Sequence, residues 1–364
     1  MTHIVFTVVN DLTYDQRMNR ICSSLANHGY EVTLVGRKLN ESVPLANKSF
    51  RQKRLTLLFR KGKLFYLEYN IRLFFYLLFK KFDVACGIDL DTILPCYLTS
   101  KIKNKQCVYD AHEIFTEVPE VIRRPFIQEL WRLVERYSIH RIKKCYTVCG
   151  ALADYFYSQY GRTFEVVRNV PLLENRFAVH EIKSTDRFIF YQGALNEGRG
   201  LEQLITAMQY IPMQLKLAGE GDLSVALRKL VLELNLSEKV IFLGQQLPDD
   251  LRKITNQSFI GVNLLENKGL SNYYSLANKF FDYVHAGVPV ITMNFPEYKQ
   301  LNQQHEVAVL VNDLETKTIV DAVVELIENK DAYFRHHEQC VLARQEWNWQ
   351  KEEQILLAFY QSLT

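Results

Sequence analysis

The chain has 364 residues, of which 48% are hydrophobic, and its formal net charge is +3. This length favours two domains over one, the apolar content excludes a disordered chain, and the near-neutral charge gives no sign of a nucleic-acid partner. Seven cysteines, an odd number scattered through apolar runs, indicate reduced core residues rather than a disulfide framework or a zinc site.

The N-terminal stretch MTHIVFTVVN has neither a basic leader nor a small-residue cleavage site, and its pattern is that of a first strand. The longest apolar run, LFFYLLF (73–79), is far too short to span a membrane as a helix. We therefore expect a cytoplasmic protein.

Short β-branched runs alternate with longer helical stretches along the chain. The predicted strands of the first half are IVFTVV, EVTLVG, FDVACG, CVYDAH and CYTVCG. Those of the second half are FIFYQG, LKLAGEG, VIFLGQ, FIGVNLL, VPVITM and VAVLV. Helices are predicted over 17–28, 125–143, 201–209, 223–234, 276–286 and 318–328. Continuous apolar runs indicate parallel strands covered on both faces, so the pattern predicts an α/β fold of two doubly wound, Rossmann-like domains.

The segment 51–81 is strongly basic, with nine Lys and Arg residues interleaved with Phe, Tyr and Leu, and Glu68 as its single acidic residue. Such a segment can lie on an anionic membrane surface, or it can be a core helix with a solvated basic edge. No recognised RNA-binding module accompanies it. We expect peripheral contact with the inner face of the plasma membrane and no nucleic-acid partner.

The stretch VRNVPLLENRFAVHEIKSTDRF is polar and lacks a sustained period, so we place the interdomain linker there. The expected boundaries are an N-terminal, acceptor-side domain over 1–170, a linker over 171–187, a C-terminal domain over 188–345 and a last helix over 346–364. A ligand of such a protein should bind at the carboxyl ends of the strands, in the cleft between the halves.

The first loop, VNDLTYDQRMNR, has no glycine, which excludes the dinucleotide fingerprint, and no P-loop motif occurs. In the second half, YQGALNEGRGLEQLITAM has a glycine-bearing loop with Arg199 before a helix, which suits a diphosphate. LAGEGD and IFLGQQLPDDL also end strands in glycines, which permits the close approach of a ligand.

The stretch SNYYSLANKFFDYVHAGVPVI places Ser275, Asn278, Lys279 and Asp282 on one face of a predicted helix. Lys279 would supply positive charge to phosphates, and the carboxylate of Asp282 could accept two hydrogen bonds from a ribose diol. The alternative is an ordinary Lys–Asp pair on a helix surface.

In this order, GRGLEQLITA, LAGEGD, VIFLGQ and SLANKFFDYVHAGVPVI resemble the donor half of the family-4 retaining glycosyltransferases, which have the GT-B fold. VYDAHEIFTEVPE resembles the Asp-x-His-Glu segment of their acceptor half. The resemblance covers nearly the whole chain. It implies two Rossmann-like domains that face each other across a cleft, with the last helix crossing back to the first domain.

The resemblance also implies roles for single residues. The carboxylate at the position of Asp282 binds ribose, Arg199 contacts the diphosphate, and His112 reaches the donor sugar near the reacting carbon. The catalytic candidates are His112, Asp91, which could orient an acceptor hydroxyl, and Glu113 beside them. The donor-binding candidates are Gly193, Arg199, Gly219, Gly221, Gly244, Asn278, Lys279 and Asp282.

Metal-using transferases bind a cation through an Asp-x-Asp pair, and GIDLDTILP contains Asp89 and Asp91 at that spacing. A metal pair should belong to the donor-binding half, whereas this one follows a strand of the first half. We interpret it as a loop facing the cleft, and we expect neither a metal nor a cofactor, since the UDP- or GDP-linked sugar is a substrate.

Two positions depart from the family pattern: Tyr274 stands where the first carboxylate of Glu-x7-Glu occurs, and Ala194 where many members have Arg. We expect a glycosyltransferase that moves a sugar, with retention, to a saccharide or lipid-linked saccharide in surface polysaccharide or glycoconjugate synthesis. The alternatives are a nucleotide-sugar 2-epimerase and a catalytically inactive nucleotide-binding partner of a polysaccharide assembly complex.

Overall fold

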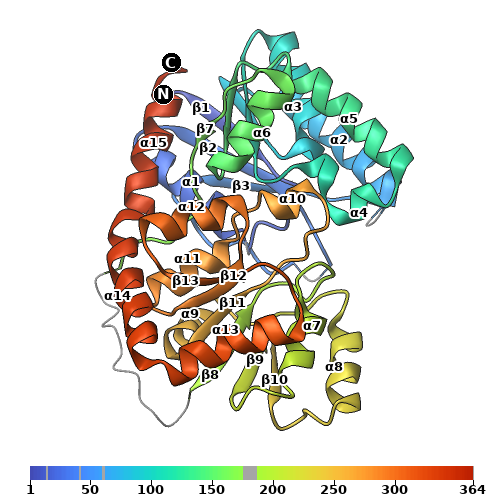
Figure 1. Ribbon diagram of the computed structural model, residues 1–364. Helices are drawn as coiled ribbons and strands as arrows, with labels where there is room; N and C mark the ends of the chain where they lie inside the picture. Colours follow the sequence, from blue (N-terminus) through green and yellow to red (C-terminus); the bar gives the residue numbers. More distant parts are fainter. Residues whose placement is uncertain (14, 41, 60–61, 175–186, 364) are drawn as a thin grey trace. The chain divides into compact units, whose positions relative to one another are not determined.

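The structure is a computed structural model (Figure 1) that describes residues 1–13, 15–40, 42–59, 62–174 and 187–363. The chain divides into two compact units, one formed by Met1–Asn169 with Glu352–Thr364 and the other by Val170–Lys351. Most of the expected linker, 171–187, lies outside the described residues. Each unit contains one parallel sheet, and this confirms the predicted fold class of two Rossmann-like α/β domains.

The first unit is built on a sheet whose strand order is β3-β2-β1-β4-β5-β6-β7. Its strands are β1 (His3–Thr7), β2 (Glu31–Arg37), β3 (Arg51–Leu55), β4 (Val84–Ile88), β5 (Gln106–Ala111), β6 (Lys144–Thr147) and β7 (Glu165–Val166). All neighbouring strands pair in parallel. The chain order reverses between β1 and β4, and the carboxyl ends of strands at such a reversal are where open α/β sheets bind ligands.

The helices of the first unit alternate with these strands. They are α1 (Gln16–Asn27), α2 (Gly62–Phe79), α3 (Leu90–Lys103), α4 (Pro119–Ile122), α5 (Pro125–Ile139) and α6 (Gly150–Tyr160), with the short 3-10 helix η1 (Phe115–Glu117) and the terminal α15 (Trp349–Gln361). Asp15 caps α1 by accepting a hydrogen bond from the backbone N–H of Met18, and Gly161 ends α6 in the left-handed conformation.

The edge strand β3 and the helix α3 were not predicted from the sequence. Four of the five residues of β3 are polar or charged, which is common on an edge strand because charge there discourages pairing with other chains. Residues 87–95 were expected to form a loop, but Asp91 lies in the first turn of α3. Pro95 lacks the N–H that would bond to the Asp91 carbonyl, and the Asn70 side chain donates to that carbonyl instead, at 2.9 Å.

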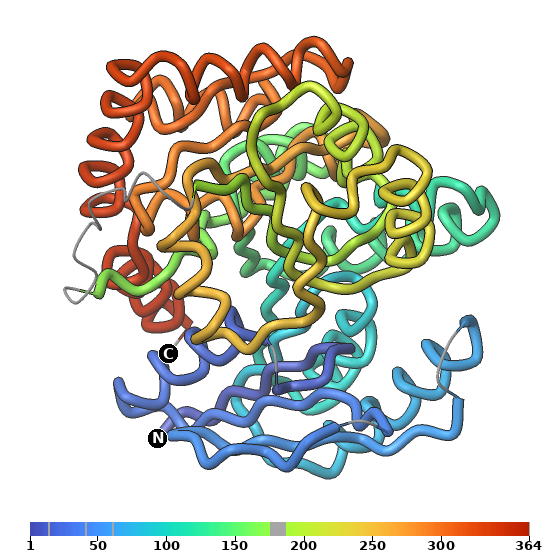
Figure 2. Tube along the Cα trace, turned by 90° about the horizontal axis from the view of Figure 1, so that it is seen from below, coloured from blue at the N-terminus to red at the C-terminus, as the bar shows by residue number. Residues whose placement is uncertain are grey.

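The last helix packs on the first unit, as predicted (Figures 1 and 2 show the end of α15 beside β1). The ring of Tyr360 lies 5.8 Å from that of Phe6 and 6.3 Å from that of Tyr146, and Phe359 also contacts Tyr146. Trp347 precedes α15, and its ring lies 6.0 Å from that of Phe281 in the second unit.

The second unit has a sheet of order β10-β9-β8-β11-β12-β13, again parallel throughout. Its strands are β8 (Phe188–Gln192), β9 (Gln214–Ala218), β10 (Val240–Gly244), β11 (Ile260–Asn263), β12 (Val290–Met293) and β13 (Ala308–Val311). Its helices are α7 (Leu201–Ala207), α8 (Ser224–Glu233), α9 (Pro248–Gln257), α10 (Leu270–Tyr273), α11 (Asn278–His285), α12 (Pro296–Gln304), α13 (Thr316–Glu328) and α14 (Lys330–Glu346). The strand order reverses between β8 and β11.

Within the described residues, no helix is both long enough and apolar enough to cross a bilayer.

Tyr360 is only 1% exposed. Its packing predicts that truncation of this side chain strongly destabilises the first unit. Tyr360→Ala should lower the free energy of unfolding of the first unit by about 3–5 kcal/mol, because the lost ring leaves a cavity between Phe6 and Tyr146. Tyr360→Phe keeps the ring and should cost only about 1 kcal/mol. Chemical denaturation of both variants measures the difference, and equal costs would contradict this packing.

Candidate functional site

Glycine-bearing loops follow β8, β9 and β10 at the carboxyl edge of the second sheet. The N–H of Gly193 donates to the Ala218 carbonyl at 2.9 Å, and that of Gly219 donates to the Gly244 carbonyl at 2.8 Å, so the three loops are joined through their backbones. A side chain on Gly219 would lie 2.0 Å from the Gly193 carbonyl oxygen, and one on Gly221 would lie 2.2 Å from Asn196. These two glycines are therefore required by loop packing, and not only for the approach of a ligand.

Helix α11 begins at Asn278, after the extended residue Ala277. Ser275 lies before the helix, where its hydroxyl donates to the Asn272 carbonyl, so the prediction that it shares the helix face was wrong. Asn278, Lys279 and Asp282 are in the helix at spacings of three and four residues and lie on one side of it. Its apolar residues, among them Phe280, Phe281, Tyr283 and Val284, are buried, and this fixes the polar side chains at the edge of the sheet.

The ammonium group of Lys279 lies directly over the edge of the sheet. Its Nζ is 3.8 Å from the centre of the Tyr191 ring and 3.4 Å from the position that a Cβ on Gly193 would take. Burial and the charge of Arg199 lower the pKa of Lys279 well below its usual value, although Asp282 opposes this shift. Lys279 is thus a cation whose surroundings do not fully compensate its charge.

Arg199 lies in the loop after β8, between Gly198 and Gly200, both of which have positive φ angles. Its charge lowers the pKa of Lys279 and acts against the burial that raises the pKa of Tyr191 to about 12. Arg199 is therefore within electrostatic range of both residues. Lys279 and Asp282 lie on one side of α11, and the charge of Arg199 acts on Lys279.

Gln192, the last residue of β8, bonds to the Asp282 carboxylate through its side chain. The side-chain amide of Gln192 donates to Asp282 Oδ2 at 2.6 Å, and its oxygen accepts a hydrogen bond from the Thr255 hydroxyl at 2.7 Å. Gln192 is only 4% exposed, so this chain of bonds is internal and orients the carboxylate. Gln192 lies in the stretch YQGALNEGRGLEQLITAM, but no functional role is predicted for it from the sequence. A polar residue at the end of a buried strand is the signal that could have indicated one.

In the first unit, a buried ion pair lies beside His112. Arg17 NH2 is 3.1 Å from Asp110 Oδ1, and both side chains are almost fully buried. Arg17 also donates to the Val167 carbonyl at 3.1 Å. Burial alone would raise the pKa of Asp110, but Arg17 and His112 outweigh it and lower that pKa below its usual value. Both members of the ion pair are therefore charged, and both contact the His112 ring.

His112 follows β5 directly and remains partly exposed. Its Nε2 lies 2.9 Å from Arg17 Nε and also 2.9 Å from Asp110 Oδ2. One ring nitrogen cannot accept a hydrogen bond from Arg17 and donate one to Asp110 at the same time. The protonation state of His112 Nε2 therefore determines whether it bonds to Arg17 or to Asp110. Burial lowers the pKa of His112, but Asp110 and Asp89 outweigh burial and raise the pKa above its usual value.

Asp89 holds the backbone of His112 in place. Its Oδ1 accepts a hydrogen bond from the His112 N–H at 2.8 Å, and its backbone has a φ of 54°, a conformation that residues other than glycine rarely adopt. Asp91 and Glu113 are partly buried in the same region, where burial and the charges of Asp89 and Glu113 raise the pKa of Asp91 well above its usual value. Asp91 is therefore within electrostatic range of Asp89 and Glu113, and Asp89 in turn is bonded to the His112 backbone.

Asp89 and Asp91 have the spacing of an Asp-x-Asp metal site. In the part of the chain that the structure describes, no group of three or more His, Cys, Asp or Glu side chains has the arrangement of a metal site. Asp89 is bonded to the His112 backbone, and Asp91 lies in the first turn of α3.

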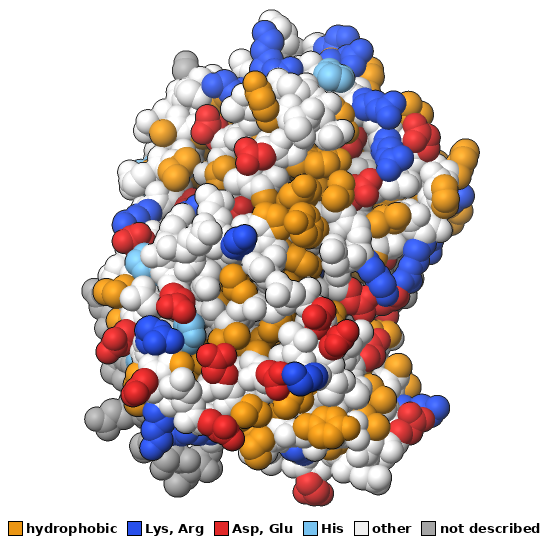
Figure 3. All heavy atoms as spheres, in the orientation of Figure 1, with side chains coloured by type: hydrophobic (Ala, Val, Ile, Leu, Met, Phe, Trp, Pro, Cys, Tyr) orange, Lys and Arg blue, Asp and Glu red, His pale blue; other side chains and the backbone are white. Residues whose placement is uncertain are grey.

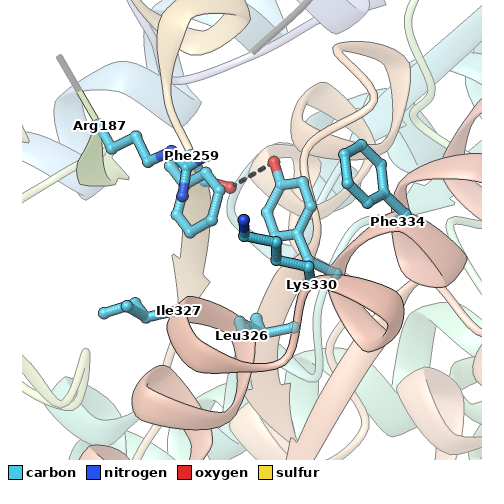
Figure 4. A pocket seen from close by; sticks show the side chains of 7 residues that line it. Arg187, Phe259, Leu326, Ile327, Lys330 and Phe334 are labelled. Atoms are coloured by element: carbon cyan, nitrogen blue, oxygen red, sulfur yellow. Dashed lines mark hydrogen bonds between the residues drawn. The ribbon is translucent and has the colours of Figure 1, made fainter. Parts of the chain in front are cut away.

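A small cavity of about 150 Å³ lies at the amino ends of two strands of the second sheet. It is lined by Arg187, Phe259, Leu326, Ile327, Lys330, Tyr333 and Phe334 (Figure 4). Arg187 precedes β8 and Phe259 precedes β11, so the cavity is at the amino ends of these strands, whereas Lys279 and Asp282 are at the carboxyl ends. The cavity is thus separate from the candidate site.

Comparison with known proteins identifies the second unit. Residues 174–343 match the family model described as "Glycosyl transferases group 1". This unit is a glycosyl transferases group 1 domain. The match includes the three glycine loops and α11, so the clustered residues of the second unit lie within the family domain.

One curated relative is an N-acetylgalactosamine-N,N'-diacetylbacillosaminyl-diphospho-undecaprenol 4-alpha-N-acetylgalactosaminyltransferase of Campylobacter jejuni subsp. jejuni. It is 40% identical over 84 residues, which are 22% of this chain and 23% of that protein. The alignment therefore spans about a quarter of the relative's length.

Solved structures show the same fold over the whole chain. A sucrose-phosphate synthase of Thermosynechococcus elongatus has a TM-score of 0.80 and 17% identity, with 100% of this chain and 99% of that chain covered. Anabaena Alr3699/HepE, solved with UDP and glucose, has a TM-score of 0.75 and 14% identity, with both chains covered completely. These likenesses show that the chain shares the two-domain fold of these structures.

The arrangement around His112 predicts how its pKa responds to Asp89. Asp89→Asn should lower the pKa of the His112 ring, because one of the two carboxylates that raise it is lost while burial and Arg17 still lower it. The pKa is measured by NMR titration of the imidazole. Asp83→Asn, which removes a carboxylate paired with Lys105, is the control and should leave the titration unchanged. An unaltered pKa in Asp89→Asn would contradict the proposed electrostatics.

Proposed function

We propose that the protein is a glycosyltransferase that transfers a sugar, with retention and without a metal ion, from a nucleoside-diphosphate sugar to a saccharide or lipid-linked saccharide. The observation that carries this proposal is the cluster of Arg199, Lys279 and Asp282 at the reversal point of a glycosyl transferases group 1 domain. Crevices outside the carboxyl ends of strands at such a point are the usual ligand sites of open α/β sheets.

The cluster matches the parts of a nucleoside diphosphate by chemistry. Arg199 and Lys279 lie close enough to disturb each other electrostatically, and a diphosphate between them would neutralise both. The Asp282 carboxylate, oriented by Gln192, is an acceptor for ribose hydroxyls. During transfer, negative charge grows on the departing diphosphate, and two preorganised cations would stabilise it without a metal.

In the first unit, His112 is the proposed contact to the donor sugar, and Asp91 the proposed partner of an acceptor hydroxyl. Both assignments come from the family resemblance and from the strand-end position of His112. The buried Arg17–Asp110 pair would hold the imidazole in a defined orientation. We assign no general base.

The names of two similar proteins indicate which donor and which acceptor to test. The UDP in the Anabaena structure makes a UDP-sugar the first donor to test, with GDP-sugars next. The relative from Campylobacter jejuni is named for an acceptor on diphospho-undecaprenol, which supports a lipid-linked acceptor and synthesis of a surface polysaccharide or glycoconjugate. The proposal places the protein in the cytoplasm, with peripheral contact to the plasma membrane through 51–81.

The direct test is Asp282→Ala. Loss of two charge-assisted hydrogen bonds to ribose should weaken nucleotide binding at least about a hundredfold. Calorimetric titration with UDP and GDP measures the affinity, and thermal unfolding verifies that the variant is folded. Asp321→Ala, which removes an exposed carboxylate paired with Lys317, is the matched control. Unchanged affinity of Asp282→Ala would count decisively against the site.

His112→Ala separates catalysis from binding in the same assays. We expect turnover, followed as release of nucleoside diphosphate in the presence of an acceptor, to fall much more than donor affinity. Conversion of the donor sugar without any acceptor would instead indicate the epimerase, and tight binding with no release the inactive partner.

The lowered pKa of Lys279 predicts proton uptake on binding of a UDP-sugar, whose phosphodiester groups do not titrate near neutral pH. The diphosphate should raise this pKa. At pH values between the pKa of the free protein and that of the complex, binding should therefore be coupled to proton uptake, and affinity should fall as pH rises through this range. Calorimetry in buffers of different ionisation enthalpy measures the uptake. Lys279→Arg stays charged, so its proton uptake and pH dependence should disappear; if both persist in this variant, another group is responsible.

A further inference from the structure

The cavity at the amino ends of β8 and β11 has one apolar wall that is fixed by side-chain packing. The rings of Phe259 and Tyr333 are stacked, with centres 4.2 Å apart and planes within 2° of parallel, and both side chains are buried. The Tyr333 hydroxyl donates to the Phe259 carbonyl at 3.0 Å, so its polar atom is bonded within the protein. Leu326, also buried, continues this wall. The apolar wall is therefore preformed, as in most small-molecule sites.

Two cations line the same cavity. Arg187 is half-buried, and its guanidinium lies 4.6 Å from the centre of the Phe259 ring. Lys330, the first residue of α14, is exposed. Figure 4 shows the charged ends of both side chains directed toward the Phe259 ring. An anion placed against this ring would therefore lie near both charges.

The charge of this lining differs from that of the surface around it. On the face of the second unit that Figure 3 shows, in the lower half of the view, acidic and basic side chains are mixed. The residues that line the cavity include Arg187 and Lys330 and no residue with a carboxylate. The cavity is thus a cationic spot on a surface that carries charges of both signs.

Neither cation is neutralised by its described neighbours. Within the described residues, Arg187 and Lys330 have no ion-pair partner, and the buried Nε of Arg187 donates to no acceptor. The charge of Arg187 acts against the burial that raises the pKa of Tyr333, so this charge is felt inside the apolar wall. A cation beside a desolvated apolar surface without a counter-ion gains from pairing with an anion.

The size of the cavity limits what can enter it. Its volume is about 150 Å³. An apolar protein cavity of about 150 Å³ holds one benzene molecule. The lining also includes Phe334, which is 53% exposed, so the cavity reaches the protein surface beside Lys330. A ligand with a single six-membered ring fits this volume, whereas a nucleotide or a disaccharide is too large.

We propose that this cavity binds a small aromatic carboxylate. The ring packs against Phe259 and Tyr333. The carboxylate accepts hydrogen bonds from the guanidinium of Arg187, whose forked N–H groups match its two oxygens, and from the ammonium of Lys330. A neutral aromatic molecule is a poorer occupant because it leaves both cations unpaired, and an anion without a ring leaves the apolar wall uncovered. This inference is independent of the proposed function, since the cavity is separate from the nucleotide site.

Benzoate is the probe, and its binding to the full chain is measured by ligand-observed NMR titration. We expect a Kd of about 1 mM or tighter. Benzyl alcohol has the same ring without the charge, and inorganic phosphate has charge without the ring. Each should bind at least about tenfold more weakly than benzoate. Saturating UDP should not displace benzoate.

Two variants locate the binding. Arg187→Met keeps an unbranched side chain beside Phe259 but removes the charge, and it should weaken benzoate binding at least about tenfold. Lys330→Met changes an exposed position, where folding is insensitive, and should weaken the binding about threefold. Lys317→Met, which removes an exposed lysine of α13 paired with Asp321, is the matched control and should have no effect. Thermal unfolding verifies that each variant is folded.

Several results would overturn the proposal. These are no measurable benzoate binding, equal binding of benzyl alcohol or phosphate, and unchanged benzoate affinity in folded Arg187→Met and Lys330→Met. Displacement of benzoate by UDP would place benzoate in the nucleotide site, which overturns this inference and leaves the proposed function intact. Benzoate binding that is retained in a protein with no affinity for UDP would support the cavity site and count against the proposed function alone.

Discussion

The electrostatic interaction of Arg199 with the buried Lys279, at the carboxyl edge of the second sheet, is the feature on which the proposed function depends. Arg199 and Lys279 repel each other, and the burial of Lys279 adds to the cost of its charge, so its pKa falls well below the usual value. The Asp282 carboxylate acts to raise this pKa, but burial and the charge of Arg199 outweigh it. An anion bound beside Arg199 and Lys279 would remove this repulsion, and such perturbed groups cluster at functional sites.

The rest of the second unit keeps these charges in place. The backbone bonds between the loops after β8, β9 and β10 fix the position of Gly193, whose missing side chain leaves room for the Lys279 ammonium. Tyr191 lies beneath that ammonium, and Thr255 and Gln192 orient Asp282 from α9 and β8. The first unit uses the opposite principle, because there a fully paired ion network of Arg17 and Asp110 supports a histidine that can exchange hydrogen-bond partners. The proposed role of the second-unit site is to bind an anion, and that of His112 is to contact the donor sugar.

The sequence predicted the strands well, because short, continuous apolar runs that alternate with helical stretches are typical of parallel strands covered on both faces. It also singled out Lys279 and Asp282, since polar residues on an otherwise buried helix are unusual. It did not predict α3, because Pro95 resembles a helix breaker until the Asn70 side chain, distant in sequence, is seen to bond to the Asp91 carbonyl. Nor did it predict the role of Gln192 or of Gly219, since each depends on a contact with another loop or helix. What the sequence could not supply was therefore the set of long-range polar contacts that orient the site.

The most direct measurement is hydrogen–deuterium exchange of the whole protein with and without saturating UDP. The account predicts slower exchange of backbone N–H groups in the loops after β8, β9 and β10 and in α11, with no change around Arg187 and Lys330 at the other edge of the sheet. Protection confined to the cavity beside Phe259, or no protection in α11, would contradict the assignment of Arg199, Lys279 and Asp282 to a nucleoside-diphosphate site.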